Sequence, residues 1–280
     1  MEAKSLRMIT YLSPNVPVEV FETIMQYLEE KLEREAYLIY ESRWSGPPRS
    51  RTDPFTKDEA DVGFICSPSF LRLQDRKNKY IEHIPVAPVF VHPKGENRPV
   101  YFSDVIIHSD NKSSIKEFHD LKGRRLGYSD SESLSGNFIV LSQLKKMGTN
   151  TSFFASTFCS GSHLNSIRMV LDRVVDVAAI DSNCLRAFLK KNPELRSSIH
   201  ILTTWGPMSV YPMVVNARLP EELKSRIAEV MLTMHEDPRW QPKLQELDII
   251  KFVPIDTSLY NFERELLKDV EKLSIDTPYY

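Results

Sequence analysis

Several features that would assign this chain to a familiar class of protein are scarce or missing. Only three cysteines occur, Cys66, Cys159 and Cys184. Their odd number argues against a disulfide framework, and none of them forms a CxxC pair. We therefore expect a reduced chain that holds no metal ion and no cofactor.

Long apolar runs and an excess of one charge are missing as well. No stretch is long enough to cross a bilayer, so no membrane insertion is expected. The net charge is −2, and no basic stripe with interleaved aromatics occurs, which argues against nucleic acid as a partner. The first strand is predicted within a few residues of Met1, too early for a signal peptide. We expect a cytoplasmic protein, or a periplasmic or extracellular one if a leader has been removed.

What the sequence does contain is the pattern of an α/β protein. It has 280 residues, of which 41% are hydrophobic and 26% charged, as in a globular protein large enough for two lobes. Strands are predicted at Leu6–Leu12, Tyr37–Tyr40 and Ala60–Ile65, and an amphipathic helix at 17–34. This alternation predicts βαβ units and mostly parallel sheets.

The later strands predict where the chain passes between the lobes. They are expected at 84–92, 101–108, 124–128, 152–157 and 174–180, and the last is apolar enough for the middle of a sheet. The chain leaves the first lobe near Tyr101 and returns near Trp205. We therefore predict one lobe from residues 1–103 and 206–280, and the other from residues 104–205.

The stretch from Lys122 to Gly148 is the first candidate for a binding site. It predicts a short strand, a loop rich in hydroxyls and a helix that begins near Ser135, which would be the N-cap. Gly136 would let a ligand approach the backbone, and a helix start favours anions. Ser133 and Ser135 would add hydroxyl donors. An ordinary capped connection explains this segment equally well.

Three segments together resemble a known family. They are SIKEFHDLKGRRLGYSDSESLSG (114–136), GSHLNSIRMVLDRVVDVAAIDSN (161–183) and ADVGFICSPSFL (60–71). They resemble type 2 solute-binding proteins, and most of all the phosphonate-binding branch, the receptors of phosphonate and phosphite ABC importers. The resemblance covers the chain in order from Leu6 to about Asp256. It implies the two-lobe type 2 periplasmic-binding-protein fold, whose α/β lobes close like a hinge over a ligand.

The resemblance also implies roles for individual residues. Ser133 and Ser135 match hydroxyls that hold phosphonate oxygens, with the Gly136 amide beside them. His163 matches a ligand-facing histidine at the next helix start. A cationic or N–H-donating imidazole there would complement a phosphonate, and its proton state could couple binding to pH near neutrality. Taken alone, His163 could equally be a helix-capping histidine. The complete predicted set is Ser133, Ser135, Gly136, His163 and Asp181 in one lobe, with Ser67, Trp44 beside Arg43, and Tyr211 outside it.

Departures from the family pattern narrow the expected ligand. Leu134 stands where the family often has threonine, so one hydroxyl is lost. Asn183 stands where an acid would hold a ligand amine, although Asp181 lies two residues earlier, and another family acid falls at Tyr211. This favours a small oxyanion over aminoalkyl phosphonates. Trp44, Trp205 and Tyr211 could instead line an apolar pocket.

Two alternative functions use the same fold. A cytosolic enzyme, similar to those of thiamine-pyrimidine or menaquinone synthesis, would use Cys66, His163 and Asp181. The cysteine-rich cluster of the thiamine-pyrimidine enzymes is missing, however. A LysR-type effector domain would follow a DNA-binding region, for which the five residues before Leu6 leave no space. We therefore expect a monomeric, non-catalytic receptor, sensor or carrier for a small anion, with a transporter or signalling partner left open.

Overall fold

The structure is a computed structural model and describes residues 5–11, 16–41 and 44–275. These residues form two compact units, each described separately below. The predicted turn at 13–15 and Arg43 lie outside the described residues. Within the ranges given, no helix has the length and apolarity needed to span a membrane.

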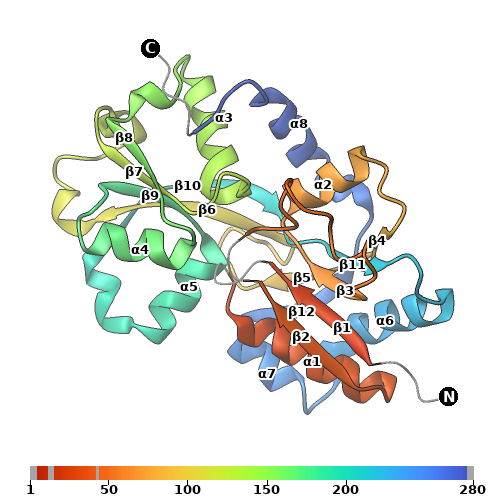
Figure 1. Ribbon diagram of the computed structural model, residues 1–280. Coiled ribbons are helices and arrows are strands. Elements are labelled where there is room, and N and C mark those ends of the chain that lie inside the picture. Colours follow the sequence, from red (N-terminus) through yellow and green to blue (C-terminus); the bar gives the residue numbers. More distant parts are fainter. Residues whose placement is uncertain (1–4, 12–15, 42–43, 276–280) are drawn as a thin grey trace. The chain divides into compact units, whose positions relative to one another are not determined.

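Unit 1 contains a five-stranded mixed sheet with the order β2-β1-β3-β11-β4 (Figure 1). β1 pairs in parallel with β2 and β3, whereas β11 runs antiparallel to β3 and β4. A separate antiparallel pair joins β5 and β12. The strands are β1 Leu6–Thr10, β2 Ala36–Tyr40, β3 Val62–Phe64, β4 Ile81–His83, β5 Val86–Phe90, β11 Met213–Asn216 and β12 Ile249–Pro254.

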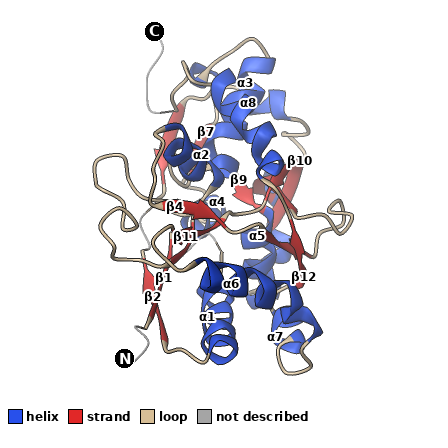
Figure 2. Ribbon diagram, turned by 90° about the vertical axis from the view of Figure 1, so that its right-hand side faces the viewer, coloured by secondary structure: helices blue, strands red, loops and turns tan. Residues whose placement is uncertain are grey.

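The helices of unit 1 come from distant parts of the sequence, and three of them pack together. They are α1 Val18–Leu32, α2 Ser67–Asp75, α6 Glu221–Thr233 and α7 Gln241–Glu246. The predicted apolar face of α1 is buried, and the Tyr27 hydroxyl donates a 2.8 Å hydrogen bond to the Val230 carbonyl. The Tyr27 and Trp240 ring centroids lie 5.3 Å apart, edge to face. Figures 1 and 2 both show α1 grouped with α6 and α7.

Unit 2 contains a second five-stranded sheet with the order β10-β6-β9-β7-β8. Its strands are β6 Val100–His108, β7 Arg125–Tyr128, β8 Ser156–Cys159, β9 Val177–Asp181 and β10 Ile199–Ser209. Its helices are α3 Ile139–Lys146, α4 His163–Leu171, α5 Ser182–Lys191 and α8 Asn261–Asp269. β9 is fully buried between β6 and β7, which confirms that this apolar strand lies mid-sheet.

The C-terminal segment belongs to a different unit from the one that the sequence predicts. The chain passes from unit 1 to unit 2 between Val100 and Tyr101, and back to unit 1 between Met208 and Ser209. The segment from Phe262, however, groups with unit 2 and not with the lobe that holds 206–261. The Lys145 ammonium, for example, lies 2.6 Å from an Asp269 carboxylate oxygen. The apolar pattern of α8 shows that one face is buried, but it carries no information about which unit covers it.

Some predicted strands also differ in extent. The strand predicted at 84–92 starts at Val86, and β4 precedes it. The strand predicted at 152–157 is a 3₁₀ turn, Thr151–Phe153, followed by β8, because the Asn150 side chain accepts from the Ser152 amide and caps the turn. The other 3₁₀ turns are Ser109–Asn111, Phe118–Leu121, Pro193–Ser198, Met234–Glu236 and Thr257–Tyr260.

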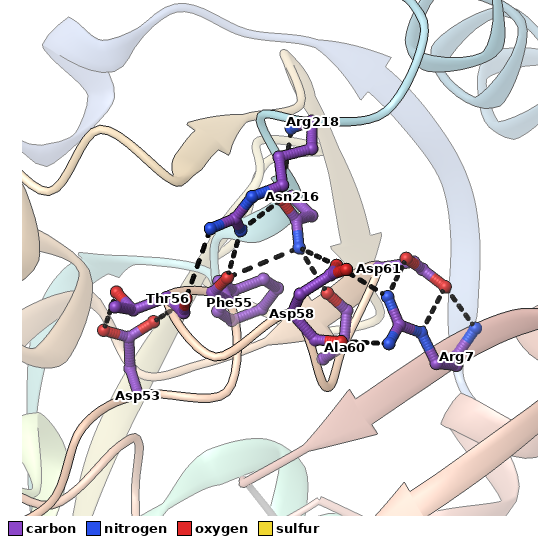
Figure 3. A network of polar contacts seen from close by, with 9 residues as sticks. All are labelled: Arg7, Asp53, Phe55, Thr56, Asp58, Ala60, Asp61, Asn216 and Arg218. Atoms are coloured by element: carbon purple, nitrogen blue, oxygen red, sulfur yellow. Dashed lines mark hydrogen bonds and ion pairs between the residues drawn. The ribbon is translucent and has the colours of Figure 1, made fainter.

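A polar network links neighbouring strands at one end of the unit 1 sheet (Figure 3). Asp61 accepts from the Arg7 guanidinium through both oxygens, at 2.9 and 2.7 Å, and from the Arg7 amide at 2.9 Å. Asn216, 1% exposed, donates to the Ala60 carbonyl at 3.0 Å and to Asp58 Oδ1 at 3.2 Å. Because the Asp61 side chain is only 6% exposed, the pair holds β1 and β3 together with little solvent screening.

We predict that Asp61→Ala lowers the free energy of unfolding by roughly 2–4 kcal/mol, because it leaves the Arg7 charge without its two-pronged partner. Urea unfolding followed by circular dichroism measures the change. The matched control is Asp110→Ala, whose pair with Arg173 is exposed on both sides and should cost less than about 1 kcal/mol. Equal losses in the two variants would contradict the prediction.

Candidate functional site

The candidate site of unit 2 lies where several strands end at one edge of the sheet. β7 runs parallel to β8 and β9, so the loops that follow all three begin at the same edge. Ser103, near the start of the antiparallel β6, is in register with Asp181, the last residue of β9. The topology therefore brings the starts of three helical segments and Ser103 to one edge.

The helix after β7 begins earlier than predicted, and Ser133 is its N-cap. Ser133 has extended backbone angles, and its hydroxyl accepts from the Gly136 amide at 3.0 Å. A π-helical turn, Leu134–Phe138, leads into α3, because the Ser133 carbonyl accepts from the amides of both Asn137 and Phe138. The prediction of Ser135 as N-cap is thus wrong. Since Ser133 caps the turn, the Ser135 side chain is available for another contact.

The Ser135 side chain contacts His163. Ser135 Oγ lies 3.1 Å from His163 Nε2, and the two residues are 3% and 1% exposed. His163 is the first residue of α4, but the cap of that helix is Ser162, whose hydroxyl accepts from the Asn165 amide. The helix-capping explanation of His163 therefore does not apply, and the two predicted site residues are brought together.

His163 is a neutral imidazole. Burial lowers its pKa from 6.5 to about 3, because a ring removed from water loses the solvation that favours its charged form. The expectation of a cationic imidazole that titrates near neutrality is therefore wrong for the ligand-free protein. A neutral ring still offers a hydrogen-bond donor or acceptor at Nε2, depending on the tautomer.

Gly136 lies in the centre of this group. A Cβ at position 136 would lie 2.4 Å from Ser129 Oγ and 3.1 Å from both Ser133 Oγ and His163 Cε1. Only glycine fits there without displacing one of these groups. The close packing also shows that Ser129, Ser133 and His163 surround the same backbone atom.

Two serines of this group were missed in the sequence. Ser129, fully buried, has a hydroxyl with no hydrogen-bond partner in the described part of the chain, and Ser103 donates to the Ser135 carbonyl at 2.8 Å. The alternation of serines at 129, 131, 133 and 135 was a usable signal for Ser129. Ser103 interrupts an apolar strand, and nothing in the sequence relates it to a loop 32 residues away. We call Ser103, Ser129, Ser133, Ser135, Gly136 and His163 the hydroxyl cluster.

Asp181 has a local structural role. It is the N-cap of α5, and its Oδ1 accepts from the Asn183 amide at 2.8 Å and the Cys184 amide at 3.3 Å. Capping by an aspartate at a helix start is favourable without any ligand. A role for Asp181 in binding stays a prediction.

The remaining predicted residues belong to unit 1. Ser67 begins α2, is 2% exposed, and has no hydrogen-bond partner for its hydroxyl among the described residues. The Trp44 ring lies 4.8 Å below the Arg51 guanidinium, and the buried Tyr211 ring is edge to face with Phe90. Trp205, in unit 2, packs against Phe118. These contacts account for each aromatic as packing, and their part in ligand binding stays a prediction.

The hydroxyl cluster is suited to holding an anion. It offers hydroxyl groups, a helix start and a neutral ring, whereas bond-breaking chemistry needs a titrating acid or base against an orienting partner. Over the described ranges no group of three metal-ligating side chains occurs. Cys66, the cysteine of the enzymatic alternative, is a buried residue of unit 1 at the start of α2.

Comparison with known proteins was consistent with this chemistry. Residues 6–260 match the family described as the periplasmic substrate-binding protein of phosphonate ABC transporters. A binding protein of Prochlorococcus marinus in complex with methylphosphonate has a TM-score of 0.78 at 17% identity, with 96% of this chain and 99% of that chain covered.

Two further solved structures share the fold. The binding component of a phosphonate ABC transporter from Pseudomonas aeruginosa has a TM-score of 0.79 at 17% identity, covering 96% of this chain and 87% of that one. The aliphatic sulphonate binding protein of Escherichia coli has a TM-score of 0.64 at 12% identity, covering 97% and 93%. These likenesses establish the type 2 binding-protein fold.

The family match decides between the functions left open by the sequence. Members of the family are substrate-binding proteins of ABC transporters and not enzymes, so the enzymatic alternative is set aside. The family is described as periplasmic, so the expected cytoplasmic location is not supported. The match spans most of the chain, and the chain belongs to the phosphonate-binding family of periplasmic substrate-binding proteins of ABC transporters.

Proposed function

We propose that the chain binds a small phosphonate, phosphite or phosphate-like oxyanion at the hydroxyl cluster and delivers it, in the periplasm, to the membrane part of an ABC importer. The observation that carries the proposal is the buried contact of 3.1 Å between Ser135 Oγ and His163 Nε2, beside the unpartnered hydroxyl of Ser129. A buried hydroxyl without a partner is costly unless a ligand satisfies it.

The hydrogen-bond inventory favours an anion as that ligand. Ser133 Oγ accepts from Gly136, so its own proton remains to be donated. If the neutral His163 carries its proton on Nε2, it donates to Ser135 Oγ, and the Ser135 hydroxyl proton can also point to a ligand. Ser129 supplies a third donor. Its position in the group would compensate for the hydroxyl that is lost at Leu134.

Methylphosphonate is the first ligand to test. A protein of Prochlorococcus marinus with this fold is in complex with methylphosphonate. The cluster contributes donors for oxygen atoms, and Asp181 is engaged as a helix cap. We therefore expect simple oxyanions to bind more tightly than aminoalkyl phosphonates. The closure of two lobes implied by the family resemblance concerns the placement of the two units and stays a prediction.

We predict that Ser135→Ala weakens methylphosphonate binding by about 10- to 100-fold, because it removes a donor and the partner of His163, a loss of roughly 1–3 kcal/mol. Isothermal titration calorimetry measures the affinity. Ser133→Ala should weaken binding and also lower stability by roughly 1 kcal/mol, since Ser133 is a helix cap.

The matched control is Ser142→Ala, the same chemical change at a buried position of α3 outside the cluster. Its affinity should equal that of the unaltered protein. If phosphate, phosphite and methylphosphonate all fail to bind, or if Ser135→Ala binds methylphosphonate normally, the helix start is only a cap.

We predict that His163 makes the fold more sensitive to acid. The unfolded chain takes up a proton at His163 near pH 6.5 and the folded chain only near pH 3. Because the unfolded state binds the proton first, the stability contributed by neutral His163 is present above 6.5 and is lost as the pH falls from 6.5 toward 3.

Urea unfolding across this pH range tests the prediction without any ligand. His163→Gln should lose less stability on acidification than the unaltered protein, whereas the exposed His119→Gln should follow the unaltered curve. Parallel curves for all three proteins would show that His163 titrates normally and that the cluster is open to water.

A further inference from the structure

A second concave site, distant in sequence from the hydroxyl cluster, lies within unit 1. It is a cavity of about 600 Å³ between the loop at 47–56 and the segment from Arg72, on α2, to Tyr80. Its lining carries six cationic side chains, Arg49, Arg51, Arg72, Arg76, Lys77 and Lys79, and a single carboxylate, Asp53. We call it the basic pocket.

The single carboxylate does not pair with these cations. Asp53, 8% exposed, accepts from the Thr56 amide at 2.8 Å, the Thr56 hydroxyl at 2.7 Å and the Asn78 side-chain amide at 2.9 Å. All three donors are neutral. In the described part of the chain, Arg51, Arg76, Lys77 and Lys79 have no carboxylate within salt-bridge distance. The pocket therefore contains four cations, Arg51, Arg76, Lys77 and Lys79, that no carboxylate of the described chain pairs with.

The walls of the pocket are fixed to each other. Arg72 Nη2 donates to the Pro47 carbonyl at 2.6 Å, which ties α2 to the start of the loop. The bond from Asn78 to Asp53 ties the other end. A Cβ at Gly46 would lie 2.3 Å from Ser69 Oγ, so the loop packs directly on α2. The basic pocket is therefore a formed cavity, with no need for the loop to fold over a ligand.

The polar network of the unit 1 sheet also holds the end of this loop. Arg218 donates to the Phe55 carbonyl at 2.7 Å and to the Thr56 carbonyl at 3.2 Å (Figure 3). Thr56 is itself a lining residue. Hydrogen bonds thus hold the loop at its start and at its end.

Helix stabilisation explains only part of this charge. Cations in the last turn of a helix offset its partial negative charge, which accounts for Arg72, Arg76 and Lys77. It does not account for Arg49 and Arg51, which come from the loop and add like charge to the same cavity. Like charges held close together repel each other, and a bound anion would remove that cost.

We propose that the basic pocket is a second anion site, which takes a small polyanion carrying two or more phosphate groups. A guanidinium group binds two phosphate oxygens at once through parallel N–H groups, and a ligand with several phosphate groups can engage cations of the loop and of α2 together. The volume is that of a small-molecule site, which favours such a ligand over an acidic protein surface. The two sites share no residue, so the pocket does not depend on the function proposed for the hydroxyl cluster.

Calorimetric titration with inorganic tripolyphosphate tests the proposal. We expect saturable one-to-one binding that weakens as NaCl is raised, because screening reduces the attraction between charges. The variant Arg51→Gln with Arg76→Gln removes one cation from each wall and should weaken binding at least tenfold. The control Lys94→Gln with Lys146→Gln changes the net charge equally outside the pocket and should bind normally.

Ser135→Ala separates the two sites. It should leave tripolyphosphate binding unchanged, whether or not methylphosphonate binds to the hydroxyl cluster. Loss of tripolyphosphate binding in Ser135→Ala but not in the pocket variant would place the anion in the hydroxyl cluster and overturn the proposal. Absence of saturable binding, or equal binding by both double variants, would also overturn it. Tighter binding of hexaglutamate than of tripolyphosphate would assign the pocket to an acidic protein segment.

Discussion

The contact between Ser135 and His163 joins the two helical segments on which the candidate site depends. Their side chains meet at 3.1 Å because β7 and β8 run parallel and end at the same edge of the sheet. Ser103 extends the connection from β6 to the Ser135 carbonyl. A displacement of either helix start would leave buried polar atoms without partners, which is costly in an environment without water. The positions of the hydroxyls thus follow from the sheet topology.

Burial also determines the charge of the candidate site itself. It keeps His163 neutral, so the cluster offers hydrogen-bond donors and no formal positive charge. Such a site can select an anion by the number and direction of its oxygen atoms. The basic pocket of unit 1 has the opposite character, with many cations at a concave surface and little directional constraint. The two proposed sites would therefore select anions differently, the hydroxyl cluster by geometry and the basic pocket by charge.

The periodic patterns of apolar residues gave the most reliable predictions. The amphipathic face of α1 and the mid-sheet position of β9 were both predicted correctly, because the burial of apolar side chains follows the geometry of a helix or strand. The strand–turn–helix that carries Ser133, Ser135 and Gly136 was found for the same reason. The N-cap was misplaced by two residues, since Ser133 and Ser135 are equally good caps in isolation. Only the π-helical turn distinguishes them.

The sequence by itself determined the α/β class, the resemblance to phosphonate receptors, and the gathering of serines beside a glycine, because these depend on residues close together in the chain. The tertiary structure alone decided the neutral state of His163, the inclusion of Ser103 and Ser129, and the packing of α8 on unit 2. It also brought Arg49 and Arg51 against the cations of α2. Burial, hydrogen-bond partners and local charge density depend on which distant segments meet, and no local pattern of residues records that.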